Sequence, residues 1–133
     1  MHIVQIFPGT VPPINYGGTE RVMFWLAREL VKQGCKVTAL CDPSSDWSGT
    51  GITHVPMTLA QWHSGDYHAL IPKDADVVHY HELPPQGLYP DAPFLVTEHG
   101  SRKRFTHVTP NMVFVSANHA HNHRAPVYVP NGI

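Results

Sequence analysis

Polar side chains that could bind a ligand or move a proton gather at four places in this sequence, each at the end of an apolar run. Histidine, glutamate and serine side chains exchange protons, form hydrogen bonds or ligate metals, and glycine lets a ligand approach the backbone. Whether these groups form one site depends on the elements that carry them. The four places are Pro8–Gly9, His81–Glu82, Glu98–Gly100 and Ser116–Asn118.

The first group opens the loop PGTVPPINYGGTERV (8–22), in which two adjacent glycines directly precede a helical pattern. Backbone N–H groups at a helix N-terminus bind phosphates, and Gly17 and Gly18 leave those groups accessible. The alternative is a tight turn into a helix capped by Thr19. The sequence contains neither G-x-G-x-x-G nor G-x-x-x-x-G-K-[ST], so it supports neither a nicotinamide dehydrogenase nor a P-loop ATPase.

The segment HYHE (79–82) raises the alternative of a metal site. Strand alternation places His79 and His81 on one face, with Tyr80 and Glu82 on the other. A metal would also recruit His99, but the helical H-E-x-x-H pattern is missing and no further ligand has a motif spacing. Hydrogen bonding or ligand contact is therefore the favoured interpretation of these histidines.

The sequence gives little support for two hydrolase classes or for a second histidine site. Ser101 and Ser116 lie outside any G-x-S-x-G context, which disfavours a serine hydrolase. A glycoside-hydrolase carboxylate pair cannot be identified from spacing alone. In NHAHNH (118–123), His119 and His123 would share a helical face, and surface exposure is the favoured explanation over metal affinity.

The segments that must position these groups are short, apolar and rich in β-branched residues. TERVMFWLARELVKQG (19–34) is apolar at helical spacing along one face, and Gly34 occupies the left-handed position expected after a helix. Residues 58–70 are ambiguous, with one or two helical turns, and 116–125 predicts a short helix starting near Ser116. Strands are expected at 2–7, 35–42, 52–57, 76–82, 93–100, 111–117 and 126–133.

This order of elements predicts an α/β fold, a Rossmann-like three-layer domain with a mostly parallel sheet. In such sheets ligands bind outside the carboxyl ends of the strands, where the four polar groups fall. With 133 residues, 42% of them apolar, the chain has the size and core of one domain. The net charge of -1 argues against nucleic acid as a partner.

The cysteines and the apolar runs of the sequence indicate the cellular location to expect. Cys35 and Cys41 fall in one predicted strand, about 20 Å apart, too far to pair as a disulfide. No signal peptide and no apolar run long enough for a membrane helix is present in the sequence. These features favour a cytoplasmic protein, and a peripheral membrane contact stays open.

Several segments, taken in order, resemble the N-terminal domain of glycosyltransferase family 4, the retaining nucleotide-sugar enzymes with a GT-B fold. The co-linear set covers nearly the whole chain and is more specific than any one motif. Its most specific parts are GGTERV followed by LA.EL and G.KVT, then VVHYHE and TEHG. The full set is HIVQIFPG, YGGTERVMFWLARELVKQGCKVTALCD, DVVHYHE, PFLVTEHGS, VFVSANHA and VYVPNGI.

The resemblance implies that residues 1–133 form a single acceptor-side domain that faces a separate donor-binding domain. It implies that Gly17, Gly18 and Thr19 approach the diphosphate of a nucleotide-sugar donor, and that His99 is catalytic and lies near the transferred sugar. No cofactor and no metal is expected, because the nucleotide-sugar is a substrate. The residues expected at the acceptor or cleft are Glu20, Arg21, His81, Glu82, Glu98 and Ser101.

The chain departs from the family pattern at PNGI, where members continue into the donor-binding domain with its basic residues and E-x7-E glutamates. Stabilisation of the departing diphosphate needs both domains, so we expect this chain alone to be inactive. One alternative is a stand-alone or split-enzyme binding module that recognises a sugar or lipid acceptor or a partner subunit. Another is a metal- or pH-responsive histidine-rich protein. Self-association through an open strand-end crevice also stays open.

Overall fold

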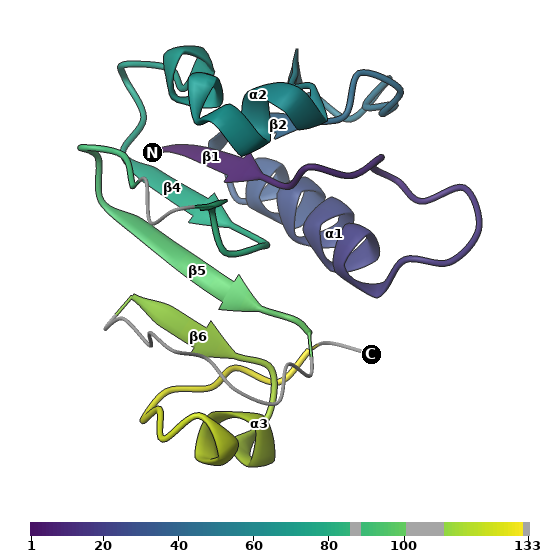
Figure 1. The fold of residues 1–133 in the computed structure, drawn as a ribbon. Helices are drawn as coiled ribbons and strands as arrows, with labels where there is room; N and C mark the ends of the chain where they lie inside the picture. The colour runs from purple at the N-terminus through teal and green to yellow at the C-terminus, as the bar shows by residue number, and fades with distance from the viewer. Residues whose placement is uncertain (86–88, 101–110, 132–133) are drawn as a thin grey trace.

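A parallel β-sheet with helices on both faces forms the centre of the molecule (Figure 1). The computed structural model describes residues 1–85, 89–100 and 111–131. Within them, six strands form one sheet in the order β3-β2-β1-β4-β5-β6, all parallel. The elements are β1 (His2–Ile6), α1 (Gly18–Lys32), β2 (Lys36–Cys41), β3 (Thr53–Pro56), α2 (Leu59–Ser64), η1 (Asp66–Leu70), β4 (Val77–Tyr80), β5 (Phe94–Glu98), β6 (Met112–Phe114) and α3 (Ala117–Asn122). The predicted Rossmann-like α/β fold is confirmed.

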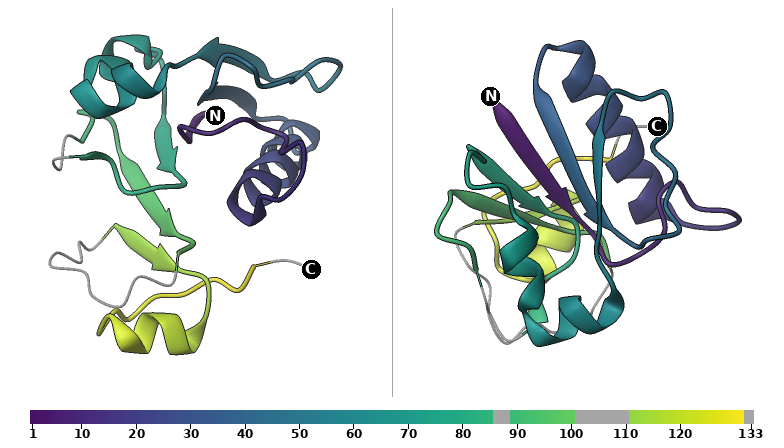
Figure 2. Two further views of the ribbon diagram at one scale, coloured as in Figure 1. Left: turned by 45° about the vertical axis from the view of Figure 1, so that its right-hand side comes forward. Right: turned by 90° about the horizontal axis from the view of Figure 1, so that it is seen from above.

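The direction of winding reverses between β1 and β4, which are neighbours in the sheet. From β1 the chain winds outward to β2 and β3, and from β4 it winds the other way to β5 and β6. Crossovers between parallel strands are right-handed. Helix α1, in the crossover from β1 to β2, and α2, in the crossover from β3 back to β4, follow opposite directions across the sheet and therefore lie on opposite faces. Figure 2 shows α1 on one side of the sheet and α2 on the other. A reversal of this kind is the usual place for a ligand crevice in an open parallel sheet.

Each face of the sheet has its own hydrophobic core. Met23 and Ala27 of α1 are fully buried against β2, in a cluster with Val37, Ala39 and Cys41. On the opposite face the larger cluster joins the aromatic side chains of α2, η1, β4 and β6: Trp62, Tyr67, Tyr80 and Phe114. The core under α1 therefore extends toward β2 and β3, away from β5 and β6.

Helix α1 begins earlier than the sequence predicted. Gly17 is the N-cap residue and the helix runs from Gly18, so the expectation that Thr19 caps it is wrong. Thr19 already lies inside the first turn, where it cannot act as the flanking cap residue. The other end is as predicted, because Gly34 takes a φ of 87°, a left-handed conformation that favours glycine.

The other predicted element boundaries agree with the structure only in part. Residues 58–70 resolve into α2 and η1, and Thr58 forms a capping box with Gln61. Ser116 caps α3 by accepting a hydrogen bond from the N–H of His119 at 3.1 Å, as expected. The expected strand at 126–133 is wrong within the described residues: only an isolated bridge joins Phe114 to Tyr128. Prolines at 126 and 130 remove the N–H donors that a longer ladder needs.

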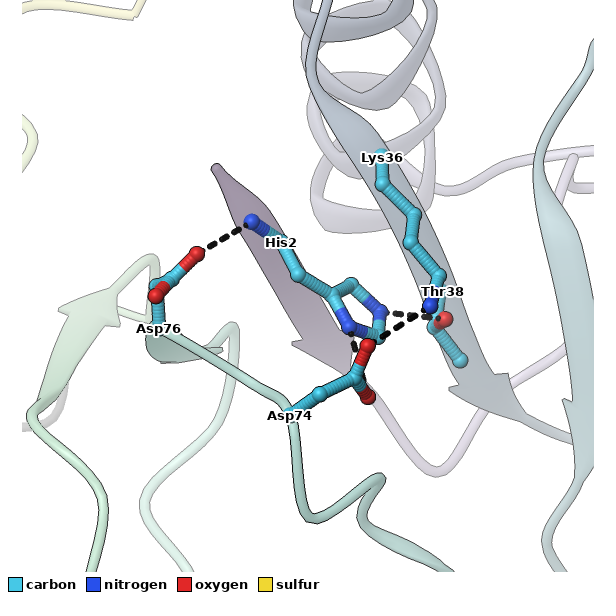
Figure 3. A network of polar contacts seen from close by, with 5 residues as sticks. All are labelled: His2, Lys36, Thr38, Asp74 and Asp76. Carbon is cyan, nitrogen blue, oxygen red and sulfur yellow. Dashed lines mark hydrogen bonds and ion pairs between the residues drawn. The ribbon is translucent and has the colours of Figure 1, made fainter.

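A polar network ties the connection before β4 to the amino-terminal edge of the sheet (Figure 3). The backbone N–H of His2 donates to Asp76 at 2.6 Å, and the His2 ring contacts Thr38 at 2.8 Å. Asp74 pairs with Lys36 at 2.8 Å and with the His2 ring at 3.1 Å. The hydrogen bond from Lys36 lowers the pKa of Asp74. This edge is thus fixed by side chains that bind one another.

Both cysteines are free thiols, as the strand spacing predicted. Cys41 is buried and its sulfur accepts a hydrogen bond from the Trp47 indole at 3.2 Å, and burial raises the pKa of the thiol. In the part of the chain that the structure describes, no helix has both the length and the apolar character needed to cross a membrane.

Candidate functional site

The loop after β1 is held at the carboxyl edge of the sheet by the loop that follows β2. The N–H of Val11 donates to the hydroxyl of Ser45 at 2.9 Å, and the N–H of Asp46 donates to the Val11 carbonyl at 2.9 Å. The hydroxyls of Thr10 and Ser44 lie 2.8 Å apart. These hydrogen bonds hold the beginning of the loop that leads to Gly17. Helix α1 begins at the edge where the parallel strands end.

Gly17 and Gly18 have different structural roles at this helix start. Gly17 is buried, and a Cβ there would lie 2.5 Å from a carboxylate oxygen of Glu20 and 2.8 Å from Pro13. Gly18 is exposed, and among the described residues no atom lies within 4 Å of the position its Cβ would take. Gly17 is thus required by close packing, whereas Gly18 leaves the backbone of the first turn open to solvent.

The two charged residues of this first turn lie beside the glycines. Glu20 places its carboxylate next to Gly17, where a negative charge interacts favourably with the N-terminal end of the helix dipole. Arg21 is exposed, and its guanidinium donates to the carbonyl of Asn15 at 3.3 Å. The exposed N–H groups at this end are suited to an anion, and the Glu20 carboxylate already supplies part of that interaction.

Three histidines come together at the ends of β4 and β5. The rings of His79 and His81 lie 4.2 Å apart, on one face of β4 as predicted. Nδ1 of His81 is 3.2 Å from Nε2 of His99, and the two rings stack at 5.4 Å. Nε2 of His79 is 2.8 Å from the hydroxyl of Thr97. The sequence motifs HYHE and TEHG thus supply a single cluster.

Burial keeps these imidazoles neutral near pH 7. Burial, assisted by the neighbouring imidazole of His99, lowers the pKa of His79 to about 4. Burial also lowers the pKa of His99 to about 4, with a smaller effect from His119. The pKa of His81 falls well below its ordinary value, again chiefly through burial. The cluster therefore acts through neutral hydrogen bonding and not as a cationic site.

The cluster lies in the wall of a cavity of about 450 Å³ between α1 and the second half of the sheet. One side is a stripe of α1, the floor comes from β4, β5 and β6, and the rim is the segment after the bridge to Tyr128. Most of the lining is apolar. The lining residues are Val22, Trp25, Leu26, Glu29, His79, His81, Leu95, Thr97, His99, Val113, Val129, Pro130 and Asn131.

The lining of this cavity brings together the first half of α1 and the histidine cluster, which lie far apart in the sequence. Val22 lies one turn after Gly18 on α1 and lines the same space as His81 and His99. Trp25, Leu26 and Thr97 were not predicted to belong to a site. The signal in the sequence was a second apolar stripe on α1, beside the one that Met23 and Ala27 bury.

The remaining predicted site residues lie elsewhere. Glu98 is buried, faces the opposite side of β5 from Thr97, and accepts the N–H of Gly100 at 2.8 Å. It therefore shapes the turn that carries His99. Glu82 is half-buried just after β4, and Ser101 lies outside the described residues. Within the described residues, no group of three or more His, Cys, Asp or Glu side chains is arranged to hold a metal ion.

Comparison with known proteins bears on the fold. No protein-family model and no curated protein matches the sequence. Among solved structures the chain is similar to AviGT4, a glycosyltransferase involved in avilamycin A biosynthesis, with a TM-score of 0.76 and 24% sequence identity. The similarity covers 99% of this chain and 42% of AviGT4. The chain therefore has the fold of a part, about two fifths, of a glycosyltransferase.

Proposed function

We propose that this chain is the acceptor-side half of a retaining glycosyltransferase of the family 4 type, which transfers a sugar from a nucleotide-sugar to an acceptor hydroxyl. The observation that carries the proposal is the juxtaposition at one sheet edge of an open helix N-terminus and a buried histidine cluster. The similarity to AviGT4 over nearly the whole chain supports it. In AviGT4 more than half of the chain lies outside the similar region.

The proposed roles follow from the geometry of each group. The N–H groups at Gly17, Gly18 and Thr19 approach the donor diphosphate, where the helix dipole favours negative charge. His99 is neutral and offers a hydrogen bond to the transferred sugar, because an imidazole with a pKa of about 4 is a weak base at pH 7. Retention of configuration, the donor and the absence of a metal requirement are part of this proposal.

Around these groups, four residues have supporting roles in the proposal. Glu20 and Arg21 form the rim of the diphosphate loop, and His81 orients His99 through their hydrogen bond. Glu82 borders the acceptor side. The charge that develops on the leaving diphosphate needs donors from a second domain, so the chain alone leaves it exposed to water and inactive. The two free thiols fit a cytoplasmic location.

The experiment is a nucleotide-release assay with UDP-glucose, GDP-glucose and dTDP-glucose. The isolated chain should not exceed the blank, and turnover well above the blank would refute the half-site proposal. A chimera in which this chain replaces the similar 42% of AviGT4 should release nucleotide only in the presence of an acceptor. His99→Ala in that chimera should lower the release by at least about tenfold.

A binding module without transfer chemistry is the second candidate. The cavity beside α1 favours it, because residues of this chain alone form the lining. Such a module would bind an acceptor-like molecule with unchanged affinity whether or not a donor-side polypeptide is present. If the folded chimera bound ligand but released no nucleotide from any donor, this second function would be preferred.

A further inference from the structure

The cavity beside α1 combines an apolar wall with a polar floor. Trp25 and Leu26 of α1 face it from one side, and Leu95 and Val113 lie in the sheet beneath. Its volume of about 450 Å³ is within the range of small-molecule sites, which are mostly apolar with a few polar groups that set orientation. Among the described lining residues Glu29 is the one with a formal charge, and its carboxylate is engaged by Lys32 at 3.2 Å. The lining thus suits an uncharged ligand.

The floor presents one donor and one acceptor through the His81–His99 pair. A neutral imidazole has one N–H and one acceptor nitrogen. The contact between His81 Nδ1 and His99 Nε2 at 3.2 Å uses one donor and one acceptor. Whichever ring donates, the two outer nitrogens must consist of one N–H and one lone pair. A hydroxyl group both donates and accepts, so it can form a hydrogen bond with either outer nitrogen, whichever tautomer the pair adopts.

Those two outer nitrogens have no partner in the part of the chain that the structure describes. Both His81 Nε2 and His99 Nδ1 are buried and lack a hydrogen-bond partner there. Buried polar atoms are nearly always satisfied in native proteins, so each such atom calls for an explanation. Both side chains also line the cavity, so we take a ligand in the cavity as the partner of one of these nitrogens.

We propose that this cavity binds an apolar molecule that carries a hydroxyl group, with its apolar body against Trp25 and Leu95 and its hydroxyl on the His81–His99 pair. The assignment of such an alcohol as the sugar acceptor rests on the proposed function, whereas the binding itself does not. An acceptor hydroxyl held beside His99 would lie at the proposed transfer site. The substrate class is thus a hydrophobic alcohol and not a sugar phosphate or a charged peptide.

The test uses two isomeric probes, 1-octanol and 1-methoxyheptane, which have the same atoms but differ in the ability to donate a hydrogen bond. Binding is followed by NMR on the ¹⁵N-labelled chain through the indole N–H signals of Trp25, Trp47 and Trp62. Trp25 lines the cavity, whereas Trp47 and Trp62 are buried in the two cores and serve as internal controls. The Trp25→Phe variant assigns the signal.

We expect the Trp25 signal to shift saturably with 1-octanol, with a Kd of about 0.1–1 mM for a ligand of this size. The ether should bind about fivefold more weakly, because it cannot satisfy the acceptor nitrogen of the pair. Leu95→Trp should occupy part of the cavity and weaken the binding of both probes. His99→Phe should bring the alcohol down to the affinity of the ether, and His63→Phe, at an exposed histidine of α2, should preserve the difference.

Three results would overturn the proposal. Equal affinities of alcohol and ether would mean that ordered water satisfies the imidazole pair. The second result is a Trp25 signal that shows no saturable shift with either probe. If the amide spectra show that the proteins are folded, this result would mean that the cavity binds no such ligand. A Trp25 shift that follows protein concentration without any probe would assign the cavity to a second copy of the chain. None of these results depends on sugar transfer, so the proposed function is tested separately by the chimera.

Discussion

Acidification should destabilise this protein through its buried histidines. His79 is almost entirely buried, and burial lowers its pKa from 6.5 to about 4. In the unfolded chain the imidazole regains its ordinary pKa, so between pH 6.5 and about 4 the unfolded state binds more protons than the folded state. The contribution of neutral His79 is therefore fully present above pH 6.5 and is lost as the pH falls toward 4.

The size of the effect follows from the two pKa values. Between pH 7 and pH 5, His79 alone lowers the free energy of unfolding by about 2 kcal/mol. For a domain of this size that corresponds to a fall of about 6–10 °C in Tm. The pKa values of His81, His99 and His119 are also lowered by burial, so their effects have the same sign. The pKa of the Asp74 carboxylate is lowered as well, but it changes the free energy of unfolding only in more acidic solution.

The assay is urea denaturation at pH 7 and pH 5 for three proteins. His79→Gln retains a group that can hydrogen-bond to Thr97 but cannot be protonated, so its loss of stability on acidification should be smaller by at least about 1 kcal/mol. His63→Gln, at an exposed position, should behave as the unmodified protein does. Equal losses in all three proteins would refute the assignment of the pH dependence to buried His79.

Four further substitutions test the fold around the site by urea denaturation. Thr97→Val should cost about 1–3 kcal/mol, because it leaves Nε2 of buried His79 without its partner, and an unchanged midpoint would contradict that hydrogen bond. Gly34→Ala should cost about 1–2 kcal/mol at its φ of 87°, whereas Gly18→Ala, at an unobstructed helical position, should be neutral or stabilising. Asp76→Ala should cost about 1 kcal/mol by removing the acceptor of the first strand's N–H, and no loss would show that water replaces it.

Local patterns predicted the elements that bury one continuous face. Val22 to Val31 has helical spacing, and the strand at 2–7 is apolar and buried on both sides, so both were recognisable without knowing their neighbours. Gly34 could also be predicted, because few residues other than glycine adopt the left-handed backbone conformation that follows a helix. The start of α1 could not be predicted in this way, because Thr19 and Gly17 are both acceptable flanking residues. In the structure Gly17 takes that position, where a Cβ would lie 2.8 Å from Pro13.

The cavity could not be predicted because it depends on strand order. His79 and Thr97 are 18 positions apart, and only the adjacency of β4 and β5 brings their side chains within 2.8 Å. The burial that makes the histidines neutral likewise depends on the layers above and below them. Trp25 was not predicted to belong to a site, and it is 52% exposed and borders the cavity. Glu98, predicted to lie at the cleft, accepts the N–H of Gly100, a contact that the sequence did not predict.

The central proposal is that the carboxyl edge of the sheet is one wall of a sugar-transfer site. The most direct test is an NMR titration of the AviGT4 chimera, with this chain isotopically labelled within it, with UDP-glucose, GDP-glucose and dTDP-glucose, read residue by residue. The proposal predicts that at least one donor shifts the amides of Gly17, Gly18 and His99 most, while those of His2 and Lys36 at the opposite edge stay unchanged. Shifts that are largest at the opposite edge, or no saturable shift with any donor, would contradict it.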